Sequence, residues 1–137
     1  MKKLGLDLGN RTLGIAISDE MNFLARGLET FRFEDSKFDI PLNYTIDLIN
    51  QHKIDTIVLG HPKNMDGSRG IQAEICEAFK ADLQEKIKIN VVLWDERLTS
   101  KMASNMMISQ NLKRKNRKKD IDKMAATIIL QGYLDSL

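Results

Sequence analysis

Residues 3–9 read Lys3-Leu4-Gly5-Leu6-Asp7-Leu8-Gly9, and residues 13–18 read Leu13-Gly14-Ile15-Ala16-Ile17-Ser18. Both stretches are short and apolar. The break between them at Gly9-Asn10 is typical of a turn, so they predict the two strands of a hairpin. Residues 22–33 predict a third strand, antiparallel to the second. The chain therefore begins with three meandering strands.

The rest of the chain alternates helices with buried strands. Apolar residues at helical spacing predict a helix that begins near Ile40, with Pro41 in its first turn. Short apolar runs predict strands at residues 56–59 and 89–94, covered on both faces. Further helices are expected over residues 71–86, 99–109 and about 120–133. The helix over 71–86 has an apolar stripe made of Ile71, Ile75, Ala78, Phe79 and Leu83. This order predicts an α/β fold in one domain, residues 1–137, with a mixed five-stranded sheet flanked by helices.

The composition is that of an ordinary globular domain, with 42% apolar and 29% charged residues among 137. Cys76 is the only cysteine, which excludes a disulfide framework, and we expect it in the core. No run approaches the ~20 apolar residues of a membrane span, and the N-terminal residues do not resemble a secretory signal. We therefore expect a cytoplasmic protein that does not bind membranes.

The basic residues are unevenly distributed. Residues 113–119 hold six cations in seven positions, although the net charge of the chain is only +2. Without this segment, 15 basic residues face 19 acidic ones. A concentrated basic segment on a mildly acidic body indicates either a contact with a polyanion or a solvated loop, and the pattern alone does not choose.

Asp7 is the strongest candidate for chemistry. It lies inside an apolar strand, where a carboxylate costs several kcal/mol unless it is paired or binds a metal ion. The structural alternative is a hydrogen bond to the backbone or an ion pair with Arg11. Gly9 and Gly14 flank the hairpin and permit close approach of a backbone or a phosphate.

Two further pairs of acids offer candidates, and the first of them stands at the carboxyl end of a strand, where α/β sheets bind ligands. Asp95 and Glu96 leave the last strand, and either could be a turn acid or an ion-pair partner. Asp120 and Asp122 precede an apolar helical stripe, Ala126, Ile129 and Tyr133, that lies on the face of Asp122. Asp120 is explained as a helix N-cap, whereas capping and the helix dipole explain Asp122 only in part.

Three converging carboxylates would suit Mg²⁺ or Mn²⁺, which prefer oxygen ligands. Two such ions about 4 Å apart would activate a water and stabilise the leaving oxygen in phosphodiester hydrolysis. The two histidines, His52 and His61, are too few for a zinc site.

Four motifs, in order, resemble those of the YqgF family, whose members are described as pre-16S rRNA nucleases and as Holliday-junction resolvases. They are Leu6-Asp7-Leu8-Gly9 through Gly14-Ile15-Ala16-Ile17-Ser18-Asp19, then Gly60-His61-Pro62-Lys63-Asn64-Met65-Asp66-Gly67-Ser68, then Asp95-Glu96-Arg97-Leu98-Thr99, and last Asp122 through Ala125-Ala126 to Ile128-Ile129-Leu130. The resemblance implies a ribonuclease-H-like fold and a metal-dependent nuclease that processes the 5′ end of pre-16S rRNA in ribosome biogenesis. It implies Asp7, Glu96 and Asp122 as catalytic and metal-binding residues.

The resemblance also implies which residues contact the nucleic acid. These are Gly9, Arg11, Lys63, Asn64, Gly67, Arg97, Thr99, Lys113, Arg114 and Lys115. Contacts to phosphate by such residues give salt-sensitive binding without base readout. The sequence departs from the family at Arg11-Thr12, where a Lys-Arg pair is usual, and at His61, where an apolar residue is usual.

Three alternatives follow from the same residues. A Holliday-junction resolvase that cuts branched DNA would use the same carboxylates. An actin-like or sugar-kinase nucleotide site, which Asp7-x-Gly9 also resembles, would need a second domain and a second phosphate hairpin. A non-catalytic nucleic-acid-binding module would keep the fold without cleavage. The oligomeric state, the choice of metal and an association with ribosome assembly stay open.

Overall fold

The computed structural model describes residues 1–62, 66–95 and 114–137, with the side chains of residues 114–121 left out. The strands in these ranges are β1 (Lys2–Leu8), β2 (Thr12–Ser18), β3 (Ala25–Arg32), β4 (Ile54–His61) and β5 (Asn90–Asp95). The helices are α1 (Asp39–His52), α2 (Ile71–Lys86) and α4 (Arg114–Asp135). Among them, none has the length and apolar character that crossing a bilayer requires.

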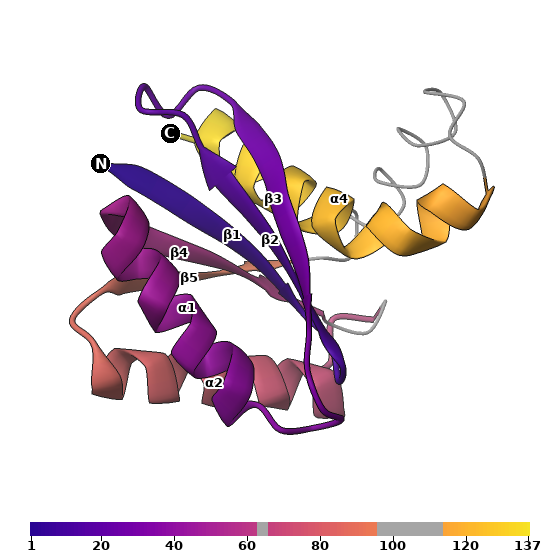
Figure 1. Ribbon diagram of the computed structural model, residues 1–137. Helices are drawn as coiled ribbons and strands as arrows, with labels where there is room; N and C mark the ends of the chain where they lie inside the picture. The colour runs from indigo at the N-terminus through magenta and orange to yellow at the C-terminus, as the bar shows by residue number, and fades with distance from the viewer. Residues whose placement is uncertain (63–65, 96–113) are drawn as a thin grey trace.

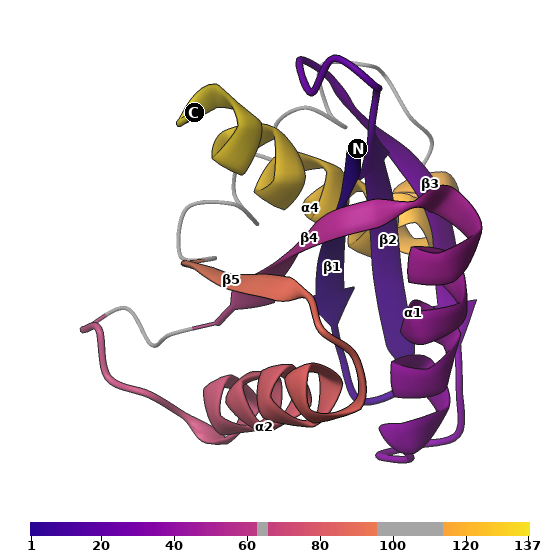
Figure 2. The same ribbon diagram turned by 90° about the vertical axis from the view of Figure 1, so that its left-hand side faces the viewer.

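The five strands form one mixed sheet in the order β3-β2-β1-β4-β5. The first three strands are antiparallel neighbours, whereas β4 runs parallel to both β1 and β5. This arrangement confirms the predicted meander and mixed sheet. One helix, α4, covers one face, and α1 and α2 cover the other (Figures 1 and 2).

Side chains of β1 alternate between the two faces, as they must in a strand. Leu4, Leu6 and Leu8 are buried in the larger core, together with residues of α1 and α2. Gly5 faces α4, because a Cβ built on it would lie 2.7 Å from the carbonyl oxygen of Ala126. The α4 side of the sheet therefore carries small residues that allow the helix to pack closely.

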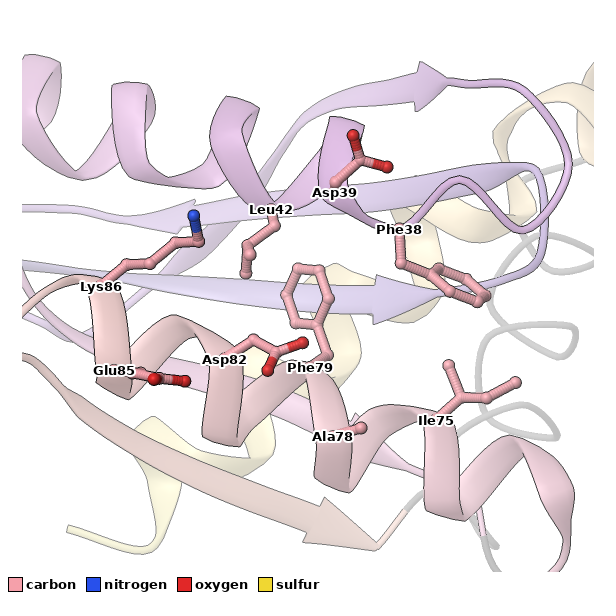
Figure 3. A pocket seen from close by; sticks show the side chains of 9 residues that line it. All are labelled: Phe38, Asp39, Leu42, Ile75, Ala78, Phe79, Asp82, Glu85 and Lys86. Atoms are coloured by element: carbon pink, nitrogen blue, oxygen red, sulfur yellow. The ribbon is translucent and has the colours of Figure 1, made fainter.

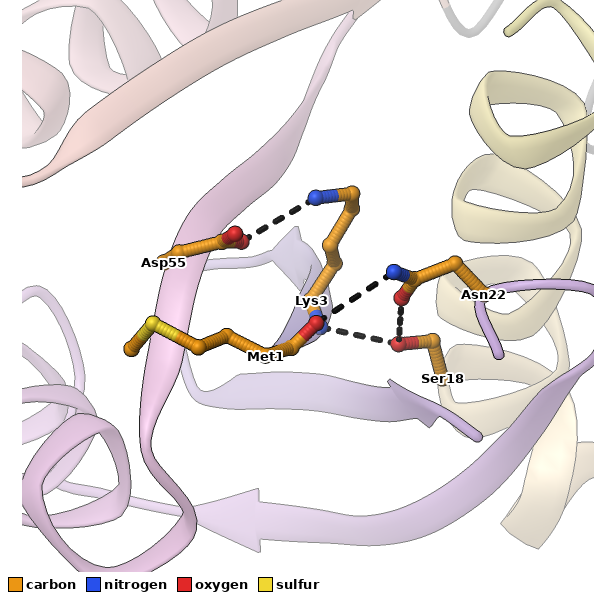
Figure 4. Close-up of polar contacts among 5 residues, drawn as sticks. All are labelled: Met1, Lys3, Ser18, Asn22 and Asp55. Carbon is orange, nitrogen blue, oxygen red and sulfur yellow. Dashed lines mark hydrogen bonds and ion pairs between the residues drawn. The ribbon is translucent and has the colours of Figure 1, made fainter. Parts of the chain in front are cut away.

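The beginning of β1 is fixed by polar contacts at the end of the sheet remote from Asp7 (Figure 4). The backbone N–H of Lys3 donates to Oγ of Ser18 at 2.8 Å, and its Nζ forms an ion pair with Asp55 at 3.1 Å. The Ser18 hydroxyl donates to Asn22, whose side-chain amide donates to the carbonyl of Met1. These contacts hold β1 in register with its neighbours.

Two predictions about helices were wrong. The last helix begins at Arg114 and not near Asp120, so the basic residues from 114 onward are helical and Asp120 is not an N-cap. Lysine and arginine are good helix formers, and no glycine or proline interrupts this run.

In α2, Ile71 and Ala78 of the predicted apolar stripe are exposed, because the buried side is centred on Ala73 and Cys76. Cys76 itself is buried, as predicted.

Candidate active site

Asp7 lies near the carboxyl end of β1, half-buried, on the face that α4 covers. Its neighbours Leu6 and Leu8 are buried on the other face. The Cα of Asp7 pairs with Gly14 of β2, and Gly14 pairs in turn with Thr30 of β3. These three residues therefore form one row across the sheet on the α4 side.

Gly14 brings the second acid to this row. A Cβ on Gly14 would lie 2.1 Å from the carbonyl oxygen of Asp122 and 2.5 Å from its carbonyl carbon, which no real side chain tolerates. The backbone of α4 at Asp122 thus rests directly on the residue that pairs with Asp7. The structure therefore places the backbone of Asp122 beside the row that holds Asp7, although the two residues are more than 100 positions apart in the chain.

Thr12 orients the Asp122 carboxylate. Its hydroxyl donates to Oδ2 of Asp122 at 2.8 Å, from a position two residues before Gly14 on the same face of β2. Asp122 lies well inside α4 and not in its first turn, so neither capping nor the helix dipole explains it. Sequence reasoning missed this role for Thr12. The only signal was that Thr12 departs from the family pattern.

The structure separates Asp95 from Asp7. Leu93 packs against the larger core on the α1/α2 side, whereas Trp94 packs against the α4 core. Because side chains alternate along β5, Asp95 falls on the α1/α2 side, where its Cα pairs with His61. Asp95 therefore does not share the face of Asp7. Glu96, the third predicted carboxylate, lies outside the described residues.

The carboxylates of Asp7 and Asp122 suit a hard divalent cation, since both donors are oxygens and neither histidine nor cysteine joins them. Two like charges on one face also repel each other, and a cation would offset that repulsion. Within the described ranges, no three His, Cys, Asp or Glu side chains gather as a metal site.

A network beside the carboxyl end of β4 ties the following loop to α2. Nε2 of His61 lies 2.7 Å from Glu77, and Arg69 donates two hydrogen bonds to the same carboxylate at 2.7 and 2.8 Å. These hydrogen bonds lower the pKa of Glu77, and the bond with His61 has a larger effect than the bonds with Arg69. Within the loop, Ser68 closes a turn on Asp66, and Gly67 has a φ of 89°. His61 thus ties the end of β4 to α2 through Glu77, and Arg69 ties the loop to the same carboxylate.

Only some of the residues predicted to contact nucleic acid lie in the part of the chain that the structure describes. The amide of Gly9 donates to the carbonyl of Thr12 at 2.8 Å, so it closes the hairpin. The exposed Arg11 pairs with Asp35 at 3.2 Å. Hydrogen bonds from Ser36 and Arg11 lower the pKa of Asp35, and the bond from Ser36 has the larger effect. Predicted contacts outside the described residues are Lys63, Asn64, Arg97, Thr99 and Lys113, and the side chains of Arg114 and Lys115 are likewise not described.

The mixed sheet, and a C-terminal helix that packs on the same face of the sheet as the aspartate of the first strand, define the ribonuclease-H-like class. Solved structures agree with this class. A fowlpox virus resolvase in complex with Holliday-junction DNA matches with a TM-score of 0.62 at 14% identity, over 99% of this chain and 98% of that one. RuvC of T. thermophilus, bound to a Holliday-junction substrate, matches with a TM-score of 0.59 at 13% identity, over 94% and 91%.

Sequence comparison identifies the family. The family model "RuvX: Holliday junction resolvase" matches residues 1–136. A relative from Bacillus licheniformis, which bears the name "Putative pre-16S rRNA nuclease", is 51% identical over 137 residues, covering 100% of this chain and 99% of its own. The chain therefore belongs to the RuvX (YqgF) family, which confirms the resemblance to the YqgF family that the four sequence motifs indicated.

Proposed function

We propose that this protein hydrolyses phosphodiester bonds of a nucleic acid with Mg²⁺ or Mn²⁺ held by Asp7, Glu96 and Asp122. The close approach of α4 to Gly14 carries the proposal, since it sets Asp122 beside the row of Asp7. Trp94 packs on the α4 side and Asp95 falls on the opposite side of the sheet, away from Asp7. That placement makes Asp95 unsuitable as the third ligand and supports the choice of Glu96, which the family motif implies.

Each residue of this site has a distinct task. Asp7 presents its carboxylate from a central strand, so its position is fixed by the sheet. Asp122 is held by the Thr12 hydroxyl, which selects one orientation of its carboxylate before any ligand binds. The bound cation would supply Lewis-acid chemistry, that is, activation of a water and stabilisation of the leaving oxygen.

The substrate that we propose is precursor 16S rRNA, cut at its 5′ end during ribosome biogenesis. The support is the name of relatives about half identical over the full length of the chain. Arg11 and the basic segment that runs into α4 would contact phosphates, so binding would be strong at low salt and independent of sequence.

The second candidate is a Holliday junction cut by the same carboxylates. The description of the matching family favours it, as do two structural neighbours solved with junction DNA. Those neighbours are below 20% identical, so they support the fold more than the substrate.

The test is cleavage of matched pre-16S rRNA and four-way DNA junction substrates with Mg²⁺ or Mn²⁺. Asp7→Asn and Glu96→Gln should abolish cleavage while binding survives. Asp55→Asn is the matched control, since Asp55 pairs with Lys3 at the far end of the sheet. Persistent cleavage by Asp7→Asn protein would show that the site is wrong. If the unmodified protein binds but never cuts, the protein is a non-catalytic binding module.

A separate test addresses the basic segment. Neutralising Lys113, Arg114 and Lys115 should weaken RNA binding and reduce the slope of affinity against salt concentration, because fewer counterions are released. If the slope of affinity against salt concentration is unchanged, these residues do not contact phosphates.

A further inference from the structure

A groove of ≈ 540 Å³ lies between α1 and α2 (Figure 3). It is on the side of the sheet opposite α4, and therefore opposite Asp7 and Asp122. Its volume falls within the range of roughly 300–1,000 Å³ that is typical of ligand sites. The proposed nuclease chemistry makes no use of it.

The floor of the groove is apolar. Leu42 of α1 and Phe79 of α2 are buried there, and the half-buried Phe38 and Ile75 form its walls. Ile71, one helical turn before Ile75, is 79% exposed. The apolar stripe that the sequence predicted for α2 thus continues past the core and onto the surface. Apolar side chains that line a groove at the surface are typical of interaction sites.

The rim of the groove is acidic. Asp39 of α1 and Asp82 and Glu85 of α2 line it, with Lys86 as the one base among its lining residues (Figure 3). None of these four side chains takes part in the ion pairs found among the described residues. Phosphate groups of nucleic acids and of anionic lipids would be repelled by this rim. A cationic partner with apolar side chains fits both the floor and the rim.

We propose that this groove docks a basic amphipathic helix of a partner protein. The apolar face of that helix would pack on Phe38, Ile75 and Phe79, and its lysines or arginines would pair with the acidic rim. Because the groove and the nuclease site lie on opposite faces, the partner and the nucleic acid bind together without competing. The proposal holds whether or not the site at Asp7 is a nuclease.

The experiment uses two fluorescent peptides of about 18 residues, each a helix with the same leucine face. One has lysines on its polar face and the other has glutamates. Binding to the full chain is measured by fluorescence anisotropy. The unmodified protein should bind the lysine peptide at least tenfold more tightly than the glutamate peptide.

Two variants locate the binding. Asp82→Lys combined with Glu85→Lys should reverse the preference, so that the glutamate peptide binds better. Ala78→Arg, at an exposed lining position, should weaken binding of the lysine peptide at least tenfold. Asp47→Lys combined with Glu20→Lys changes the net charge equally at exposed positions outside the groove and should leave the preference unchanged.

Each alternative result overturns the proposal. Equal binding of both peptides would make the acidic rim irrelevant. Loss of the preference in the Asp47/Glu20 control would assign it to net charge and not to the groove. Binding of neither peptide, or no effect of Ala78→Arg, would show that no such helix docks here.

Discussion

Replacing Thr12 with valine removes one hydroxyl and leaves a side chain of nearly the same shape. That hydroxyl donates to Oδ2 of Asp122 at 2.8 Å, and it is the one hydrogen bond to this carboxylate found among the described side chains. Valine is favoured in strands, so β2 should form as before. The carboxylate would then be free to rotate away from the side of Asp7. We predict a loss of affinity for Mn²⁺ and Mg²⁺, together with a lower stability of the folded protein.

The size of the effect follows from this contact. A hydrogen bond to a charged group contributes about 1.5–3 kcal/mol. Each 1.4 kcal/mol is about tenfold in an equilibrium constant, so the upper limit is roughly a hundredfold. Changes to residues that orient metal ligands cost about 10–100-fold in affinity. Thr12→Val should therefore raise the dissociation constant for Mn²⁺ by about 10–100-fold.

Two measurements check this prediction. Calorimetric titration of Mn²⁺ into the protein gives the affinity directly, and the Mn²⁺ dependence of cleavage gives it through activity. Thr12→Ser keeps the hydroxyl and should stay within about threefold of the unmodified protein. At saturating Mn²⁺, the cleavage rate of Thr12→Val should largely recover. Equal Mn²⁺ affinity in the valine variant would refute the role assigned to Thr12, whatever the substrate proves to be.

Three further predictions concern packing and titration. Gly14→Ala should destabilise the protein by about 1–3 kcal/mol or more, because the added methyl meets the backbone of Asp122 and no side chain can yield; an unchanged urea midpoint would contradict this. Tyr44 donates to Glu29, and this bond together with burial raises the pKa of Tyr44 to about 12. Absorbance titration should therefore show a tyrosine ionisation near pH 12 that Tyr44→Phe removes. Because the pKa of Glu77 is lowered in the folded protein, the ionised carboxylate stabilises the fold fully at pH values above the ordinary pKa of glutamate. This stabilisation is lost as the pH falls through the lowered pKa of Glu77. As the pH falls below the ordinary pKa of glutamate, Glu77→Gln protein should lose less stability than the unmodified protein, and equal losses in urea unfolding would refute the network.

The sheet and its order were predictable because their signals are local. Apolar runs, their lengths and the turn at Gly9-Asn10 specify strands, and parallel strands need a helix between them. The beginning of α4 was not predictable in the same way. A run of lysine and arginine signals solvent exposure equally in a loop and in a helix, so charge alone placed the boundary at Asp120 and not at Arg114.

The site was only partly predictable, since a pattern within one element does not give its register against another. The periodicity of α4 predicted that Asp122 lies above the apolar stripe. It could not predict that the backbone of Asp122 rests on Gly14. The hydrogen bond from Thr12 and the network of His61 with Glu77 and Arg69 join residues whose own neighbours in sequence give no sign of them. Such contacts follow from packing and need the fold.

One asymmetry in the sequence does connect the fold to the site. In β1 the large residues Leu4, Leu6 and Leu8 alternate with Gly5 and Asp7, and in β2 large residues likewise alternate with small ones. Only the face of small residues can accept the backbone of a helix in direct contact, which is what α4 does at Gly14. Asp7 lies on that face, so the packing that brings α4 down onto the sheet also brings the backbone of Asp122 beside the row of Asp7.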